Sequence, residues 1–148
     1  MIQNTFATLR LVALGLALLC GSAAAQVTPI PGSGCPGAPV PQFVGSTSIG
    51  QALGVICPPS PPPNIDFVVL GVAGRAIVFN PPLACVQRCV LACDPLDIIT
   101  GSAWRGQIPN DRSLIGVCIC VQCGTVQMNA IGRGCLLLSV ALQICITP

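Results

Sequence analysis

The segment Leu114–Cys123, Leu-Ile-Gly-Val-Cys-Ile-Cys-Val-Gln-Cys, combines the two features that decide the fold of this 148-residue chain. It is a long apolar run with the β-branched residues that favour strands. It also carries three of the eleven cysteines. Cys118 and Cys120 share one face of a strand because they are two residues apart, whereas Cys123 falls on the other face. Side chains that point the same way are poorly placed to bond to each other, so we expect each to reach a different strand.

Other apolar runs of strand length lie on both sides of this segment, and turn signals separate them at intervals near ten residues. The predicted strands are Val40–Val44, Ile49–Cys57, Ile65–Val72, Ala76–Phe79, Leu96–Thr100 and Ala103–Gln107. The run Cys135–Ile146 fits either a buried helix or a strand. Leu83–Cys93 is equally ambiguous, because its cysteines recur every four residues and share a face in either structure. The pattern predicts an all-β fold, an antiparallel β-sandwich of jelly-roll or immunoglobulin-like type.

Residues Met1–Ala25 have the features of a secretory signal peptide. Arg10 supplies the positively charged n-region, Leu11–Leu19 form a short apolar stretch, and three alanines before Gln26 suit a cleavage site. The stretch is too short to cross a membrane, which takes about 20 apolar residues. Cleavage would remove Cys20 and leave 11 − 1 = 10 cysteines. The sequence therefore predicts export and no transmembrane segment in the mature chain.

The mature chain is long enough for one domain with a modest core. Residues 26–37 are rich in proline and glycine and are expected to form an extended leader, followed by a single sandwich domain at 38–148. Inside that domain, residues 58–63 contain five prolines. Proline has no amide hydrogen for a sheet ladder, so we expect a stiff loop there.

Composition excludes several classes of function. Five arginines and four aspartates give the mature chain a net charge of 5 − 4 = +1, so it has no basic patch for nucleic acid. The chain contains no histidine, lysine, glutamate or tyrosine, and serine catalysis lacks its base. Asp94 and Asp97 flank Pro95 and are expected to be turn residues rather than an acid–base pair. Trp104 and Arg105 are expected at the rim of the sandwich. We predict no enzymatic activity and no cofactor.

The ten remaining cysteines predict five disulfides in an oxidising compartment, with a connectivity that spacing alone does not give. Cys145 is a candidate partner for the cysteines of 114–123. The cysteines concerned are Cys35, Cys57, Cys85, Cys89, Cys93, Cys118, Cys120, Cys123, Cys135 and Cys145. The alternative is metal, because three thiols spaced Cys-x-Cys-x-x-Cys at Cys118, Cys120 and Cys123 suit zinc or copper(I). A redox role for Cys120 and Cys123 is disfavoured, since the strand–helix setting of such sites is missing.

Several short motifs occur in a characteristic order along the chain. They are Gly32-Ser33-Gly34-Cys35-Pro36-Gly37, Ser48-Ile49-Gly50-Gln51, Phe67-Val68-Val69-Leu70-Gly71, Arg88-Cys89, Ile108-Pro109-Asn110-Asp111, Leu114-Ile115-Gly116 and Gln122. This order resembles an exported bacterial β-sandwich domain of the planctomycete type. The resemblance implies an antiparallel sandwich, an exported location and a bridge between Cys35 and Cys89. It implies no activity, and the other eight cysteines are additions to the pattern.

Together these features predict an exported, disulfide-stabilised structural or interaction protein, secreted or held at the cell surface, that is not catalytic. Its partner is not specified by the sequence, and self-assembly or a cell-surface partner both fit the scarcity of charge. Two alternatives stay open: a metal-thiolate binding module that uses Cys118, Cys120 and Cys123, and a surface-active coat protein.

Overall fold

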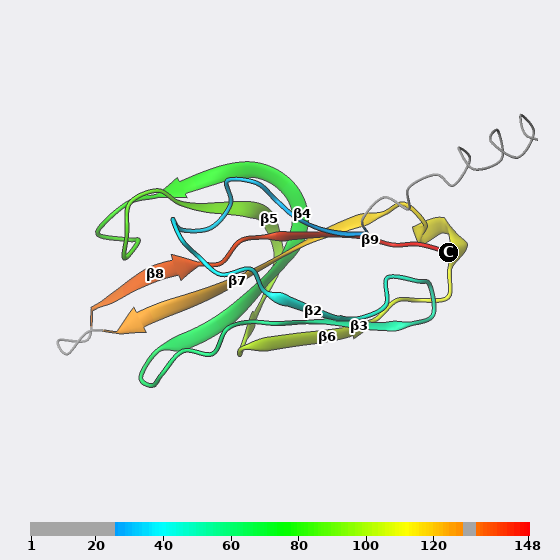
Figure 1. The fold of residues 1–148 in the computed structure, drawn as a ribbon, viewed down its shortest axis with the longest axis horizontal. Coiled ribbons are helices and arrows are strands. Elements are labelled where there is room, and N and C mark those ends of the chain that lie inside the picture. Colours follow the sequence, from blue (N-terminus) through cyan, green and yellow to red (C-terminus); the bar gives the residue numbers. More distant parts are fainter. Residues whose placement is uncertain (1–25, 129–132) are drawn as a thin grey trace, which may run out of the picture.

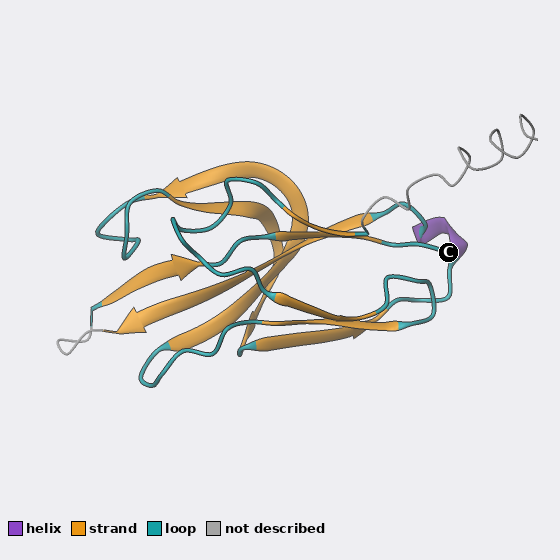
Figure 2. Cartoon of the chain, in the orientation of Figure 1, coloured by secondary structure: helices purple, strands orange, loops and turns teal. Residues whose placement is uncertain are grey.

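The structure is a computed structural model that describes residues 26–128 and 133–148. The predicted signal peptide, residues 1–25, lies outside the described residues. The described chain consists of strands and one short 3₁₀ turn, η2 (Arg112–Leu114), and all strand pairs are antiparallel (Figures 1 and 2). The predicted all-β antiparallel sandwich is confirmed. No helix in these two ranges has the length and apolar character to span a membrane.

Two sheets make up the sandwich. The main sheet has the order β1-β9-β7-β4-β5, with β8 also paired to β7, and the small sheet has the order β2-β3-β6. The strands are β1 (Val27–Pro29), β2 (Gln42–Gly45), β3 (Ala52–Ile56), β4 (Ile65–Phe79), β5 (Cys89–Thr100), β6 (Ala103–Gln107), β7 (Cys118–Met128), β8 (Gly134–Leu138) and β9 (Leu142–Cys145).

Strand β7 is the centre of the main sheet. Strand β4 pairs along one of its edges, and β9 and then β8 pair in succession along the other. Ser139 joins the two partners on this second edge, because its amide donates to the carbonyl of Cys123 and its hydroxyl accepts from the Cys123 amide. Since β1 pairs with β9, the first and last strands of the described chain lie side by side (Figure 1).

The β4–β5 hairpin bends strongly, as Figure 1 shows. Its register shifts twice, between Leu70 and Gly71 and between Ala73 and Ile77, which marks bulges. Gly71 lies at the bend, where a Cβ atom would come within 1.9 Å of the Asp94 carbonyl oxygen. The absence of a side chain therefore lets the two strands close in. The bend folds the outer half of the hairpin over the face of β7 that points away from the small sheet.

The apolar core lies on both faces of the main sheet, because the small sheet covers one face and the folded-back hairpin covers the other. One cluster fills the space between the two sheets, with Val55 from β3 and Val68, Val121 and Ile144 from the main sheet all fully buried. A second and a third cluster lie on the opposite face of the main sheet, under the folded-back hairpin. Residues 120–124 in the middle of β7 are all buried, so both faces of this stretch are covered, which explains why the sequence there is largely apolar rather than alternating.

The strands differ from the sequence-based prediction in four places. Ile65–Val72 and Ala76–Phe79 form one strand, because the bulges let β4 bend without ending. The ambiguous run Cys135–Ile146 forms two strands, β8 and β9. The leader expected at 26–37 includes β1 and adds a strand to the main sheet. Of the run Leu83–Cys93, residues 83–88 form a turn and residues 89–93 begin β5, so Cys85 lies outside the strand that holds Cys89 and Cys93.

Candidate functional site

Ten cysteines form five disulfides that fasten every layer of the sandwich. The pairs, with their Cα–Cα distances, are Cys35–Cys89 (3.9 Å), Cys57–Cys123 (5.8 Å), Cys85–Cys135 (4.9 Å), Cys93–Cys120 (5.4 Å) and Cys118–Cys145 (4.0 Å). Cys118, Cys120 and Cys123 each reach a different segment, as their strand positions predict, and Cys118 bonds to Cys145 on β9. The bond between Cys35 and Cys89 is the one that the resemblance implies.

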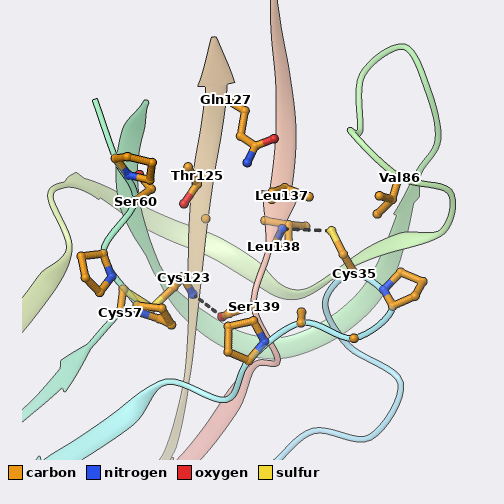
Figure 3. Close-up of a pocket in the computed structure, with 18 residues that line it drawn as sticks. Cys35, Cys57, Ser60, Val86, Cys123, Thr125, Gln127, Leu137, Leu138 and Ser139 are labelled. Carbon is orange, nitrogen blue, oxygen red and sulfur yellow. Dashed lines mark hydrogen bonds between the residues drawn. A yellow bond between two sulfur atoms is a disulfide. The ribbon is translucent and has the colours of Figure 1, made fainter. Parts of the chain in front are cut away.

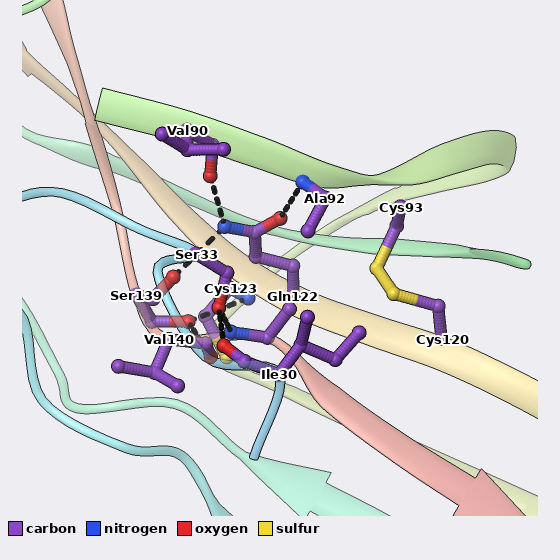
Figure 4. Close-up of a disulfide and its surroundings, with 11 residues drawn as sticks. Ile30, Ser33, Val90, Ala92, Cys93, Cys120, Gln122, Cys123, Ser139 and Val140 are labelled. Carbon is purple, nitrogen blue, oxygen red and sulfur yellow. Dashed lines mark hydrogen bonds between the residues drawn. A yellow bond between two sulfur atoms is a disulfide. The ribbon is translucent and has the colours of Figure 1, made fainter. Parts of the chain in front are cut away.

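Two of the bridges hold layers together. Cys57 follows the last residue of β3, so its bond to Cys123 ties the small sheet to the main sheet. Cys93 and Cys120 belong to β5 and β7, which flank β4 in the main sheet. In a flat sheet such strands would lie about 10 Å apart, twice the usual spacing. Their Cα atoms are only 5.4 Å apart, so this bridge fastens the bent hairpin onto β7 (Figure 4).

The other three bridges join adjacent segments. Cys118 and Cys145 are direct partners in the β7–β9 ladder. Gly34 and Val90 exchange both backbone hydrogen bonds, so Cys35 and Cys89 beside them form the closer, non-hydrogen-bonded pair of an antiparallel bridge. The Cys85–Cys135 bridge ties the turn after β4 to β8.

The disulfide connectivity bears on the metal and redox hypotheses for Cys118, Cys120 and Cys123. All three sulfurs are in separate disulfides, so none is a thiolate ligand in this structure. Among the described residues, no group of three or more cysteine, histidine or acidic side chains could hold a metal ion. Cys120 and Cys123 are not bonded to each other, because they lie on opposite faces of β7 and face different partners.

Gln122 makes a buried polar link between β7 and the folded-back hairpin. Its side chain is fully buried, and its Nε2 donates to the carbonyl oxygens of Val90 at 2.9 Å and Ser139 at 2.8 Å. Its Oε1 accepts from the amide of Ala92 at 3.0 Å (Figure 4). The side chain thus links the backbone of β5 to the backbone of the β8–β9 connection, which do not bond to each other at this point. The sequence motif marked Gln122, but nothing in it indicated this role.

A groove opens where the small sheet ends. Alternate residues of β7 point toward the small sheet: Val121 and Cys123 pack against it, whereas Thr125 and Gln127 lie beyond its end. There they line a cavity of about 420 Å³ (Figure 3). Two segments wall it, residues 36–39 and 58–61, and each directly follows a disulfide-bonded cysteine. Together these walls contain five prolines.

Asp66 lies next to the groove and supports two of its polar residues. Its Oδ1 accepts hydrogen bonds from the hydroxyls of Ser60 at 2.6 Å and Thr125 at 2.8 Å, and its Oδ2 accepts one from the Ser60 amide at 3.3 Å. Desolvation opposes ionisation, but these hydrogen bonds outweigh it and lower the pKa of Asp66 below its ordinary value. The carboxylate therefore fixes the loop after Cys57 against β7.

The remaining candidate residues lie on β5, on β6 and at η2. Asp94 and Asp97 lie in strand β5, so the prediction that they are turn residues is wrong. The reason is that β5 is an edge strand, where a bulge accommodates Pro95. Trp104 is half-buried and packs against the core between the sheets, and Arg105 beside it is exposed. Asp111 caps η2. Its Oδ1 accepts a hydrogen bond from the Ser113 amide, and this bond lowers the pKa of Asp111.

The groove was not predicted from the sequence. The proline loop at 58–63 was recognised, but its place beside β7 depends on the Cys57–Cys123 bond and on the short reach of the small sheet. Comparison of the chain with known protein families, with curated proteins and with solved structures finds no match.

Proposed function

We propose that this chain is an exported, non-catalytic structural or interaction protein that acts outside the cell or at its surface. The observation that carries this proposal is the disulfide frame, in which ten cysteines form five bridges across all layers. Such bridges form and persist in oxidising compartments. The likeness to exported bacterial sandwich domains and the signal-like residues 1–25 support the same location.

The composition supports a role without catalysis. The charged groups of the mature chain are five arginines and four aspartates. Of these, Asp66 and Asp111 are engaged by hydrogen bonds to the backbone and to hydroxyl groups. A protein of this kind acts through its shape and its surface, which the disulfides keep fixed.

Mass spectrometry of the protein recovered from the culture medium and from the cell surface tests this proposal. We expect the mature chain, starting at Gln26, to have a mass ten hydrogen atoms below that of the reduced chain, and to accept alkylating reagent only after reduction. Retention in the cytoplasm with free thiols would refute the proposal. Free thiols that bind zinc or copper stoichiometrically would favour the metal-thiolate alternative instead.

A surface-active coat protein is a second candidate, and one observation favours it. Eleven large apolar residues are exposed within residues 26–128 and 133–148, and seven of them lie between residues 72 and 98, in the β4–β5 hairpin. They are Val72, Ile77, Val78, Leu83, Val86, Leu96 and Ile98. Apolar side chains exposed in this number on one hairpin give it surface that can contact another apolar phase. A film balance measures this directly: a coat protein raises surface pressure at an air–water interface, and Leu96→Ser with Ile98→Ser should reduce the effect.

A further inference from the structure

We propose that the groove between residues 36–39 and 58–61 binds an uncharged, mainly apolar small molecule that carries a hydrogen-bond donor. This inference rests on the proposed interaction role and names the class of ligand. The cavity of about 420 Å³ falls within the range of small-molecule sites, roughly 300–1,000 Å³.

The described residues that line the groove include no charged side chain. Five of them are prolines, which lack the backbone N–H group with which proteins usually hold anions. The nearest carboxylate described above, Asp66, already accepts three hydrogen bonds. An anion would therefore be desolvated with no cationic partner in the lining, which suits a neutral ligand better.

Two of the polar lining residues and two of the apolar ones lie on different sides of the groove (Figure 3). Ser60 and Thr125 lie on one side, and Val86 and Leu137 lie toward the other. The hydroxyl hydrogens of Ser60 and Thr125 are donated to Asp66, so their oxygens are left to accept. A ligand with an apolar body and one hydroxyl or amide donor matches this arrangement.

An extended peptide is less well matched, because strand addition needs a free sheet edge. Strand β7 is paired on both edges next to the groove, by β4 and β8. The outer edge of β8 is also occupied: the Leu136 amide donates to Leu83, and the Leu138 carbonyl accepts from Cys35. The main-chain groups on the floor of the groove are therefore already used.

The groove is preformed. Each wall is held at its start by a disulfide, Cys35–Cys89 on one side and Cys57–Cys123 on the other. All four cysteines are buried. Proline fixes the backbone φ angle in both walls. Binding then orders few groups, which leaves more of the burial energy for affinity. Besides stabilising the fold, these two disulfides therefore hold the groove in its binding-competent shape.

The fully oxidised protein can be tested with the neutral fluorescent probe N-phenyl-1-naphthylamine. We expect saturable binding of one probe per chain. Gln127→Arg and Pro59→Arg place a charge at exposed positions in the groove and should each weaken binding at least about tenfold. The matched control is Leu96→Arg, an equally drastic change at a residue that is 78% exposed and outside the groove, which should leave binding unchanged. Near-ultraviolet circular dichroism checks that each variant is folded.

Competition defines the ligand class. 1-Dodecanol should displace the probe at a concentration roughly tenfold lower than dodecanoate, which has the same chain with a negative charge. Displacement by both at equal concentrations, or by a proline-rich peptide and by neither lipid, would overturn the proposal. So would a loss of binding in Leu96→Arg, which would place the probe on the exposed hairpin. The disulfide count is measured separately, so failure here leaves the proposed location and construction unaffected.

Discussion

Gln122 shows how one side chain holds two layers of this molecule. It is fully buried, and it bonds to three backbone groups on β5 and on the β8–β9 connection. A buried polar group that loses its partner costs about 1–3 kcal/mol, whereas an exposed one is solvated by water. The energetic importance of Gln122 therefore comes from what it satisfies rather than from its own burial.

Replacement of Gln122 by methionine keeps the length of the side chain and removes its hydrogen bonds. The Ala92 amide and the carbonyls of Val90 and Ser139 then lose these bonds, so we expect the free energy of unfolding to fall by about 2–4 kcal/mol. Denaturant unfolding with the disulfides intact measures this. The matched control is Gln107→Met at an exposed position on β6, which should change stability by less than about 0.5 kcal/mol. Equal effects of the two substitutions would contradict the role assigned to Gln122.

Asp66 gives a prediction about pH. Because its pKa is lowered in the folded state, the ionised form stabilises the fold above the unfolded pKa of about 3.9, and this contribution disappears as the pH falls through the folded pKa. Asp66→Asn should therefore be less stable than the wild type near neutral pH, and the difference should shrink in acid. Thr125→Val removes one hydrogen bond to the carboxylate and should raise its pKa, which carbon-13 NMR titration would detect. An unchanged pKa in Thr125→Val would rule out this account.

At the scale of the elements, the bend of the β4–β5 hairpin distinguishes this sandwich from a flat one. Two disulfides allow a controlled test of its importance, because Cys93–Cys120 and Cys118–Cys145 both span 27 residues. Loop entropy alone predicts the same stabilisation for both, about 3.5 kcal/mol. The difference is that Cys93 and Cys120 are buried in the core, whereas Cys118 and Cys145 are half-buried at the end of a ladder.

The double variant Cys93→Ala with Cys120→Ala should therefore be less stable than Cys118→Ala with Cys145→Ala. We expect the excess to be about 1–3 kcal/mol, because a cavity opens under the hairpin in the first variant only. Thermal or denaturant unfolding of the two variants side by side gives the difference directly. Equal stabilities would mean that the hairpin stays in place without its bridge.

The sequence predicted the strands better than it predicted their shape. Ala103–Gln107 was placed correctly residue by residue, because its polar and apolar residues are bounded by clear turn signals. The bend in β4 was not predicted, since glycine at 71 and 74 marks a break and a bulge equally well in sequence. Asp94 and Asp97 were wrongly predicted to lie in a turn for a related reason. Pro95 indicates a turn in sequence, but an edge strand with a bulge can also contain a proline.

The site was predicted only in part. The faces of β7 follow from residue spacing, so the separate partners of Cys118, Cys120 and Cys123 could be anticipated. The remaining pairings depend on which loops meet in three dimensions, and the spacing of cysteines along the sequence does not determine this. The groove was missed for the same reason, because its two walls are more than 15 residues apart in the chain and meet only through β7 and β8.

For the whole molecule, burial predicts the order in which the disulfides open. Three bridges are buried, since the exposed fraction of every cysteine in them is 6% or less: Cys35–Cys89, Cys57–Cys123 and Cys93–Cys120. The bridges Cys85–Cys135 and Cys118–Cys145 are half-buried. Thiol and phosphine reductants need access to sulfur, so we expect the second group to be reduced first.

Brief treatment of the folded protein with tris(2-carboxyethyl)phosphine, followed by alkylation and peptide mapping, measures this order. Species labelled only at Cys85, Cys135, Cys118 and Cys145 should accumulate before any other. Early labelling of Cys93 or Cys120 would show that the hairpin opens in solution, contrary to the packing described here.

The pairing of β1 with β9 has a consequence for how the protein is made. A nascent chain emerges from its amino end, yet its first strand finds its ladder partner only after the last strand has appeared. The bridges span 27 to 66 residues, so each early cysteine meets a non-native neighbour first, as Cys35 meets Cys57. If the chain is exported as proposed, oxidation during translocation would trap such wrong pairs, and these would have to be reshuffled to reach the native set.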